Sequence, residues 1–98
     1  MKINKIKEGS TLTVSVEGRL DTTTSPELSK ELDTSLDGVK KLVFDFSSLE
    51  YISSSGLRVL LSAQKTMNSA GEMIVRSVPE DIMEIFEVTG FSDFLTIE

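Results

Sequence analysis

The 98-residue chain carries 10 basic and 16 acidic residues, a formal net charge of −6, and has no cysteine and no histidine. The acidic surplus argues against nucleic acid or an anionic membrane as a partner, because both attract a basic face. The absence of cysteine excludes disulfides and thiol chemistry. Residues 1–6 lack a signal peptide, and no apolar run approaches the ~20 residues that span a bilayer, so we expect one cytoplasmic domain over residues 1–98.

The first strands are expected to form a hairpin. Residues 2–7 predict a weak strand, in which Ile3 and Ile6 depart from strict alternation. Residues 11–17 alternate cleanly between apolar and polar side chains, which predicts a strand with one buried face. The turn at residues 8–10 joins the two strands.

A helix is predicted to begin within residues 22–27. Thr24 followed three residues later by Glu27 fits a capping box, and Pro26 is tolerated in a first helical turn. Gly38 is a suitable residue to end this helix. The leucines of its apolar face repeat every four residues, at Leu28, Leu32 and Leu36.

A strand, a serine-rich loop and a second helix form the centre of the chain. Residues 41–46 alternate with period 2 and predict a strand, and residues 55–69 change to helical spacing. The run Ser53–Ser55 lies at this change, where a serine hydroxyl can accept a bond from a free N–H of the first helical turn. Gly56 keeps the loop small and would let another molecule approach the backbone.

The last third predicts a strand at 73–78, a helix that begins at Pro79 and ends before Gly90, and a final strand at 94–97. The expected order is therefore β-β-α-β-α-β-α-β. Strands that alternate with helices require right-handed parallel crossovers. We predict an α/β domain with a mixed, mostly parallel sheet and an antiparallel hairpin at its start.

Residues 45–57 resemble the signature of the STAS domain, specifically that of the bacterial anti-sigma-factor antagonists. The family pattern is a strand that ends in Asp-x-Ser, a short loop, and Asp-Ser-(Ser/Thr/Ala)-Gly-Leu at the start of a helix. Asp45 and Ser47 match the first part, and residues 54–57 match the second. Ser53 departs from the pattern, because the family often has aspartate there. The family has the same order of elements, so the resemblance covers nearly the whole chain.

The resemblance implies a phosphorylation switch. Ser54 takes the position of the family's phosphoacceptor serine, and Asp21 lies in a turn that the family places beside it. The unmodified protein would bind an anti-sigma factor that is also a serine kinase, and a serine phosphatase would reset it. The kinase would bring ATP and Mg²⁺, so this chain would need no cofactor or metal of its own. The implied partner-binding residues are Asp21, Ser53, Ser55, Gly56 and Arg58.

The residue patterns alone leave other interpretations open. The three serines fit simple helix capping, and Asp21 fits a turn residue. Arg58 fits a solvated helix residue. Asp45 fits a side chain that tethers the loop after its strand.

An intrinsic enzyme is not expected. The chain lacks histidine, the commonest general base, and Ile52 stands where a serine hydrolase elbow needs glycine. No phosphate-binding glycine loop is present. The alternative to the switch is the same fold acting as an unphosphorylated scaffold or sensor module in another bacterial signalling complex.

Overall fold

Along the main path of the five-stranded sheet, three strands run parallel, and an antiparallel strand forms one edge. The computed structural model describes residues 1–98 and places the strands in the order β1-β2-β3-β5. β1 is antiparallel to β2, whereas β3 is parallel to both β2 and β5. The predicted fold class, an α/β domain with a mixed sheet, is confirmed. The strand bounds are Lys2–Glu8 (β1), Thr11–Leu20 (β2), Lys41–Asp45 (β3) and Glu72–Arg76 (β5).

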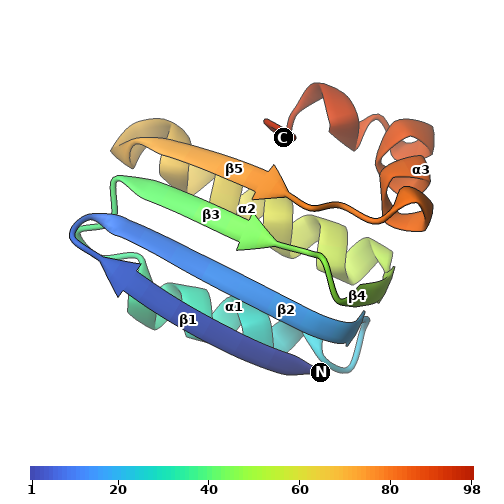
Figure 1. Cartoon of the computed structure of the whole chain (residues 1–98), viewed down its shortest axis with the longest axis horizontal. Coiled ribbons are helices and arrows are strands. Elements are labelled where there is room, and N and C mark those ends of the chain that lie inside the picture. Colours follow the sequence, from blue (N-terminus) through green and yellow to red (C-terminus); the bar gives the residue numbers. More distant parts are fainter.

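Two helices cover one face of the sheet. α1 (Ser25–Ser35) and α2 (Ser54–Ala70) lie next to each other behind the strands in Figure 1. α3 (Glu80–Thr89) lies at one end of the sheet, beyond the tip of β5. The carboxyl ends of the three parallel strands therefore meet the starts of all three helices at the same end of the molecule.

Alternation along the strands builds the core against this helical layer. Val14, Phe44 and Val75 are register partners on β2, β3 and β5, and all three are fully buried. Burying a side chain of this size stabilises the fold by roughly 1.5–3 kcal/mol. Leu28 of α1 and Leu60 of α2 close the core from the helical side.

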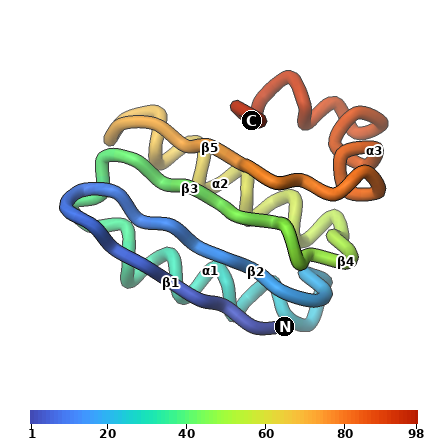
Figure 2. Tube along the Cα trace, viewed as in Figure 1, coloured from blue at the N-terminus to red at the C-terminus, as the bar shows by residue number.

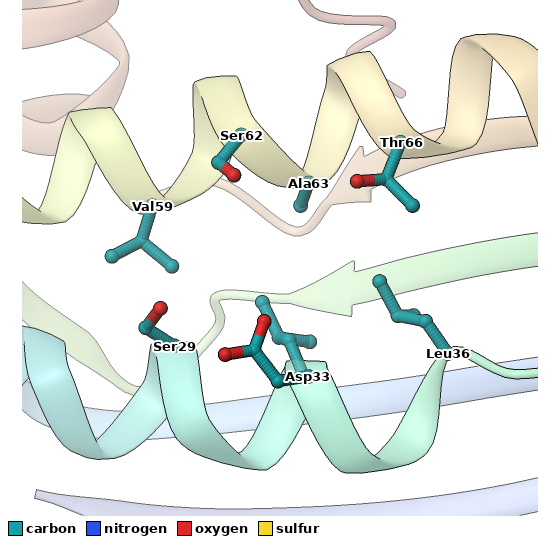
Figure 3. Close-up of a pocket in the computed structure, with 8 residues that line it drawn as sticks. Ser29, Asp33, Leu36, Val59, Ser62, Ala63 and Thr66 are labelled. Carbon is teal, nitrogen blue, oxygen red and sulfur yellow. The ribbon is translucent and has the colours of Figure 1, made fainter.

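Polar and apolar side chains in equal number line a small hollow in the contact between α1 and α2. Side chains from the two helices point toward one another across this contact in Figure 3, which labels Ser29 and Asp33 on α1 and Val59 and Ser62 on α2. The hollow between them measures about 30 Å³. That volume admits one or two water molecules, so it is too small for an organic ligand.

A short strand that the sequence pattern did not predict lies beyond the end of β3. β4 (Leu49–Ile52) pairs in parallel with the last residues of β2, and the register shifts between Gly18 and Arg19. Leu49 and Ile52 are both buried although they stand three positions apart. This irregular spacing hid the strand, since a regular strand buries every second residue.

The predicted final strand at residues 94–97 was wrong. The 3₁₀ turn η1 (Phe91–Asp93) comes directly before these residues, and the amides of Phe94 and Leu95 still donate to the Phe91 carbonyl. These bonds hold the backbone in a turn, so only Ile97 forms a single bridge to β5. The observed order is therefore β-β-α-β-β-α-β-α, followed by η1 and this bridge.

We expect Gly71→Ala to be strongly destabilising. A Cβ at Gly71 would lie 1.8 Å from the Lys40 carbonyl oxygen, the atom that accepts the Glu72 amide at 2.9 Å. The methyl group would force two backbones apart where β5 joins the sheet, at a cost of about 3 kcal/mol. Thermal unfolding followed by circular dichroism should show a lower Tm. The exposed Ser69→Ala variant should keep the wild-type Tm, and an unchanged Tm in Gly71→Ala would refute this close approach.

Candidate functional site

The carboxyl end of the parallel strands brings together segments that are far apart in the sequence. The loop after β2, the short β4 and the start of α2 lie there side by side, as the Cα trace in Figure 2 shows. Ligands of open α/β sheets bind at this end, because strand-to-helix loops expose polar groups there. The candidate site consists of two adjacent parts: the serine loop (residues 53–56) and the Asp21 turn (residues 21–24).

A backbone hydrogen bond fixes the serine loop to the sheet. The Ser53 amide donates to the Leu20 carbonyl at 2.9 Å, which continues the pairing between β2 and β4. Ser53 has extended backbone angles and is the N-cap of α2, and its Oγ accepts the Gly56 amide at 3.3 Å. The predicted capping by one serine is confirmed for Ser53.

The other two serines have different surroundings. The Ser55 hydroxyl donates to Thr22 Oγ1 at 3.4 Å, a contact that joins the serine loop to the Asp21 turn. Ser54 is the first residue of α2, is exposed and makes no side-chain hydrogen bond within the chain. Of the three hydroxyls, only that of Ser54 is both accessible and free.

Gly56 permits a close approach within the chain. It is buried, and a Cβ there would lie 2.7 Å from Ile52 Cγ1 and 2.9 Å from the Leu20 carbonyl oxygen. The expectation that Gly56 lets another molecule approach the backbone is corrected, because the chain itself fills that space. Glycine is required here so that the start of α2 can pack onto the ends of β2 and β4.

Asp21 organises the turn that precedes α1. Its Oδ1 accepts the Thr23 amide at 3.0 Å and the Thr24 amide at 3.1 Å. The Thr24 amide bond is the main cause that lowers the pKa of Asp21, with a smaller contribution from Arg19, whose Nε lies 3.7 Å from Oδ2. Asp21 is therefore a turn residue, as one interpretation held, and it also lies beside the serine loop.

The predicted capping box of α1 was wrong. The Thr24 side chain makes no capping bond with the first turn of α1. Its Oγ1 accepts the Asp21 amide at 2.9 Å and donates to the Arg19 carbonyl at 2.8 Å. The nearby Asp21 carboxylate and the strand end engage this hydroxyl, so it is turned away from Glu27.

Asp45 stabilises the loop after β3, as predicted. Its Oδ1 accepts the Ser47 amide at 3.0 Å, and this bond is the main cause that lowers the pKa of Asp45. The Asp-x-Ser pattern therefore has a local structural reason, a carboxylate that accepts the amide two residues later.

Two cationic side chains lie near the site, and the sequence singled out only one of them. Arg58 is exposed on α2, four positions after Ser54 and so one helical turn along the same face. Arg19 was missed. It stacks over the Tyr51 ring at 4.3 Å from the ring centroid, because β2 and β4 pair Arg19 with Tyr51. No sequence signal for this contact existed without β4.

Comparison with known proteins identifies the family. The model of the STAS domain family matches residues 2–98, and the chain belongs to this family. The resemblance noted for residues 45–57 is therefore confirmed.

Two curated relatives cover most of the chain. BtrV of Bordetella bronchiseptica, provisionally described as an anti-sigma factor antagonist, is 32% identical over 93 residues, which cover 93% of this chain and 80% of BtrV. The anti-sigma-B factor antagonist of Staphylococcus aureus is 30% identical over 86 residues, which cover 86% of this chain and 80% of the relative.

The fold also matches solved structures of the anti-sigma factor antagonist SpoIIAA. The unphosphorylated form matches with a TM-score of 0.85 and 17% identity, over 99% of this chain and 88% of SpoIIAA. The phosphorylated form of the Bacillus protein matches with a TM-score of 0.77 and 17% identity, over 99% of this chain and 91% of SpoIIAA. At this identity the match establishes the shared fold.

The site contains no arrangement suited to a metal. No group of three or more carboxylate, histidine or cysteine side chains converges anywhere in the chain.

None of the helices has the length and apolar character needed to cross a membrane.

We expect Gly56→Ala to destabilise the chain although alanine favours helices. Alanine gains about 1 kcal/mol over glycine inside a helix, whereas overpacking against Leu20 and Ile52 costs roughly 1–3 kcal/mol. The net effect should be a loss of about 1 kcal/mol, measured by urea unfolding. Ser62→Ala, at an exposed position of the same helix, should not lose stability. A more stable Gly56→Ala protein would contradict the close packing.

Acid should weaken the fold through Asp21 and Asp45. Both folded pKa values lie below that of the unfolded chain, so each carboxylate adds stability above about pH 4 that is lost as the pH falls through the lower folded value. The free energy of unfolding should therefore drop between pH 7 and pH 3. Asp45→Asn should reduce this drop, whereas Asp37→Asn, at a carboxylate without a hydrogen bond, should preserve it. An equal drop in wild type and Asp45→Asn would contradict the role of the Ser47 amide.

Proposed function

We propose that the chain is an anti-sigma-factor antagonist whose partner binding is switched off by phosphorylation of Ser54. The observation that carries this proposal is the free, exposed Ser54 hydroxyl between a capping serine and a serine bonded to Thr22. The names of BtrV and the Staphylococcus aureus relative support the antagonist role. The existence of SpoIIAA in unphosphorylated and phosphorylated forms supports the switch.

The partner is an anti-sigma factor that is itself a serine kinase. Binding of the unphosphorylated chain occupies the anti-sigma factor and releases a sigma factor. A serine phosphatase removes the phosphate from phosphorylated Ser54 and so restores the unphosphorylated, binding-competent chain. This chain is then a ligand and a substrate, and the kinase supplies ATP and Mg²⁺. Control of transcription places these proteins in the cytoplasm.

The docking face surrounds Ser54. Ser53 and Ser55 flank it, Asp21 lies in the adjacent turn, and Arg58 is exposed one helical turn away. Gly56 contributes by seating α2 close to the sheet, since it has no side chain and is buried.

The electrostatics of Ser54 favour a switch that leaves the fold intact. A phosphate adds about −1.5 to −2 charges near neutral pH. At a helix N-terminus such charge is favourable by roughly 0.3–1 kcal/mol at an exposed position. Burying the same dianion against a partner without a matching cation costs several kcal/mol. The effect therefore falls on the complex, and about 3 kcal/mol corresponds to a loss of roughly 100-fold in affinity.

We expect partner affinity to distinguish the phosphorylated protein from the unphosphorylated wild type. Wild type and Ser54→Ala should bind the anti-sigma factor equally well by calorimetry, and the phosphorylated protein should bind roughly 100-fold more weakly or worse. Ser54→Asp should weaken binding in part, because a carboxylate carries less charge than a phosphate. Circular dichroism should show the same fold in all forms. Equal affinity of the phosphorylated form and Ser54→Ala would refute the switch.

Phosphate mapping by mass spectrometry checks the choice of serine. After incubation with the kinase and ATP, the phosphate should lie on Ser54, and Ser55→Ala should still be modified. Phosphate on Ser53 or Ser55 in the wild type would show that the assigned register is wrong. Tight binding without any phosphate transfer would favour the scaffold function instead.

A further inference from the structure

The net charge of the molecule lies entirely in its last segment. Residues 1–76 contain ten acidic and ten basic residues, whereas residues 77–98 contain six acidic residues and neither lysine nor arginine. None of these six carboxylates forms an ion pair with the rest of the chain. The acidic side chains of this segment are Glu80, Asp81, Glu84, Glu87, Asp93 and Glu98.

One face of α3 combines this charge with exposed apolar surface. Asp81, Glu84, Ile85 and Val88 follow the spacing of one helical face and, with Thr89, line an open hollow of about 240 Å³. The buried residues Ile82 and Phe86 lie on another face of the helix and join the core.

Val88 is the clearest sign that this face is unpartnered. It is 82% exposed, more than any other large hydrophobic side chain of the molecule. Phe94, in the segment after α3, is also exposed. Apolar side chains rimmed by polar ones are typical of interaction surfaces.

We propose that this α3 face, defined by Asp81, Glu84, Ile85, Val88 and Thr89, docks a lysine- or arginine-bearing amphipathic segment of the anti-sigma factor. The inference rests on the proposed function. α3 packs against β4, the strand that leads into the serine loop. A partner seated on the serine loop can therefore reach α3 at the same end of the molecule (Figure 1).

Charge complementarity favours this occupant over nucleic acid and over a second copy of the chain. The carboxylates exclude nucleic acid and favour cations of a partner, while Val88 and Ile85 favour an apolar side chain between them. A symmetric pair of copies joined through α3 would place two uncompensated acidic faces against each other, which is repulsive.

The α3 face lies outside the modified loop, so its contribution should not depend on phosphorylation. Effects of separate sites on a binding free energy usually add. Val88→Ser should therefore lower the affinity by the same factor in wild type and in Ser54→Asp.

Calorimetry with the purified anti-sigma factor tests the proposal. Val88→Ser should bind about tenfold more weakly, because it removes apolar contact at an exposed position without disturbing the core. The pair Asp81→Asn with Glu84→Gln should also lose affinity and should show a weaker salt dependence. Ile6→Ser, at an exposed apolar residue of β1, and Asp33→Asn with Asp37→Asn, which removes equal charge from α1 and the turn after it, are the matched controls. Both controls should bind within twofold of the wild type.

Several results would overturn the proposal while leaving the proposed function intact. One is wild-type affinity of Val88→Ser for the anti-sigma factor. Another is a loss of affinity in the Asp33→Asn with Asp37→Asn control that equals the loss in Asp81→Asn with Glu84→Gln. The third is self-association of the chain in sedimentation that depends on Val88. The last result would make the face a contact between copies.

A synthetic peptide distinguishes a failure of the docking surface from a failure of the proposed function. A helical peptide with lysine and leucine on one face should shift the amide resonances of residues 81–89, and the same peptide with serine in place of leucine should not. If the anti-sigma factor fails to bind wild type while this peptide shifts α3, the docking surface is supported and the proposed function is overturned. If neither binds, the docking surface is overturned as well.

Discussion

The geometry of the candidate site depends on one hydrogen bond, from the Ser53 amide to the Leu20 carbonyl at 2.9 Å. This bond extends the pairing of β2 with β4 by one residue and fixes where α2 begins. The same strand end leads into the turn that Asp21 organises, so both parts of the site share one anchor. Gly56 makes the arrangement possible, since any larger residue would push the helix away from Leu20 and Ile52.

Much of the architecture could be predicted because it follows from local patterns. The clean alternation in residues 11–17 correctly predicted a strand. The change of period between Phe46 and Leu57 correctly predicted the end of a strand and the start of a helix, with bounds that differ from the observed ones by a few residues. The sequence patterns failed where long-range contacts or turn hydrogen bonds decide the local structure. β4 exists because β2 extends past β3 and offers an unpaired edge, and residues 94–97 do not form a strand because the Phe91 carbonyl holds the preceding turn.

The site was predictable in position but not in detail. The family resemblance correctly located the serine loop in the sequence. The different surroundings of its three serines depend on Leu20 and Thr22, more than 30 positions earlier in the sequence. Asp21 illustrates the same limit. Its carboxylate accepts two amides of its own turn, and these local bonds compete with the capping box that Thr24 was expected to form.

The contact between Ser55 and Thr22, separated by 33 positions, has a consequence for how Ser54 can be recognised. The surroundings of its hydroxyl exist only once the sheet and both helices have assembled. An enzyme that modifies Ser54, as the proposed switch requires, would therefore read a three-dimensional surface, and a linear peptide copied from residues 49–58 would lack Thr22 and the rest of the Asp21 turn. Under the proposed switch, a newly made chain that has not yet folded would escape phosphorylation, so the phosphate would mark only the folded, binding-competent protein.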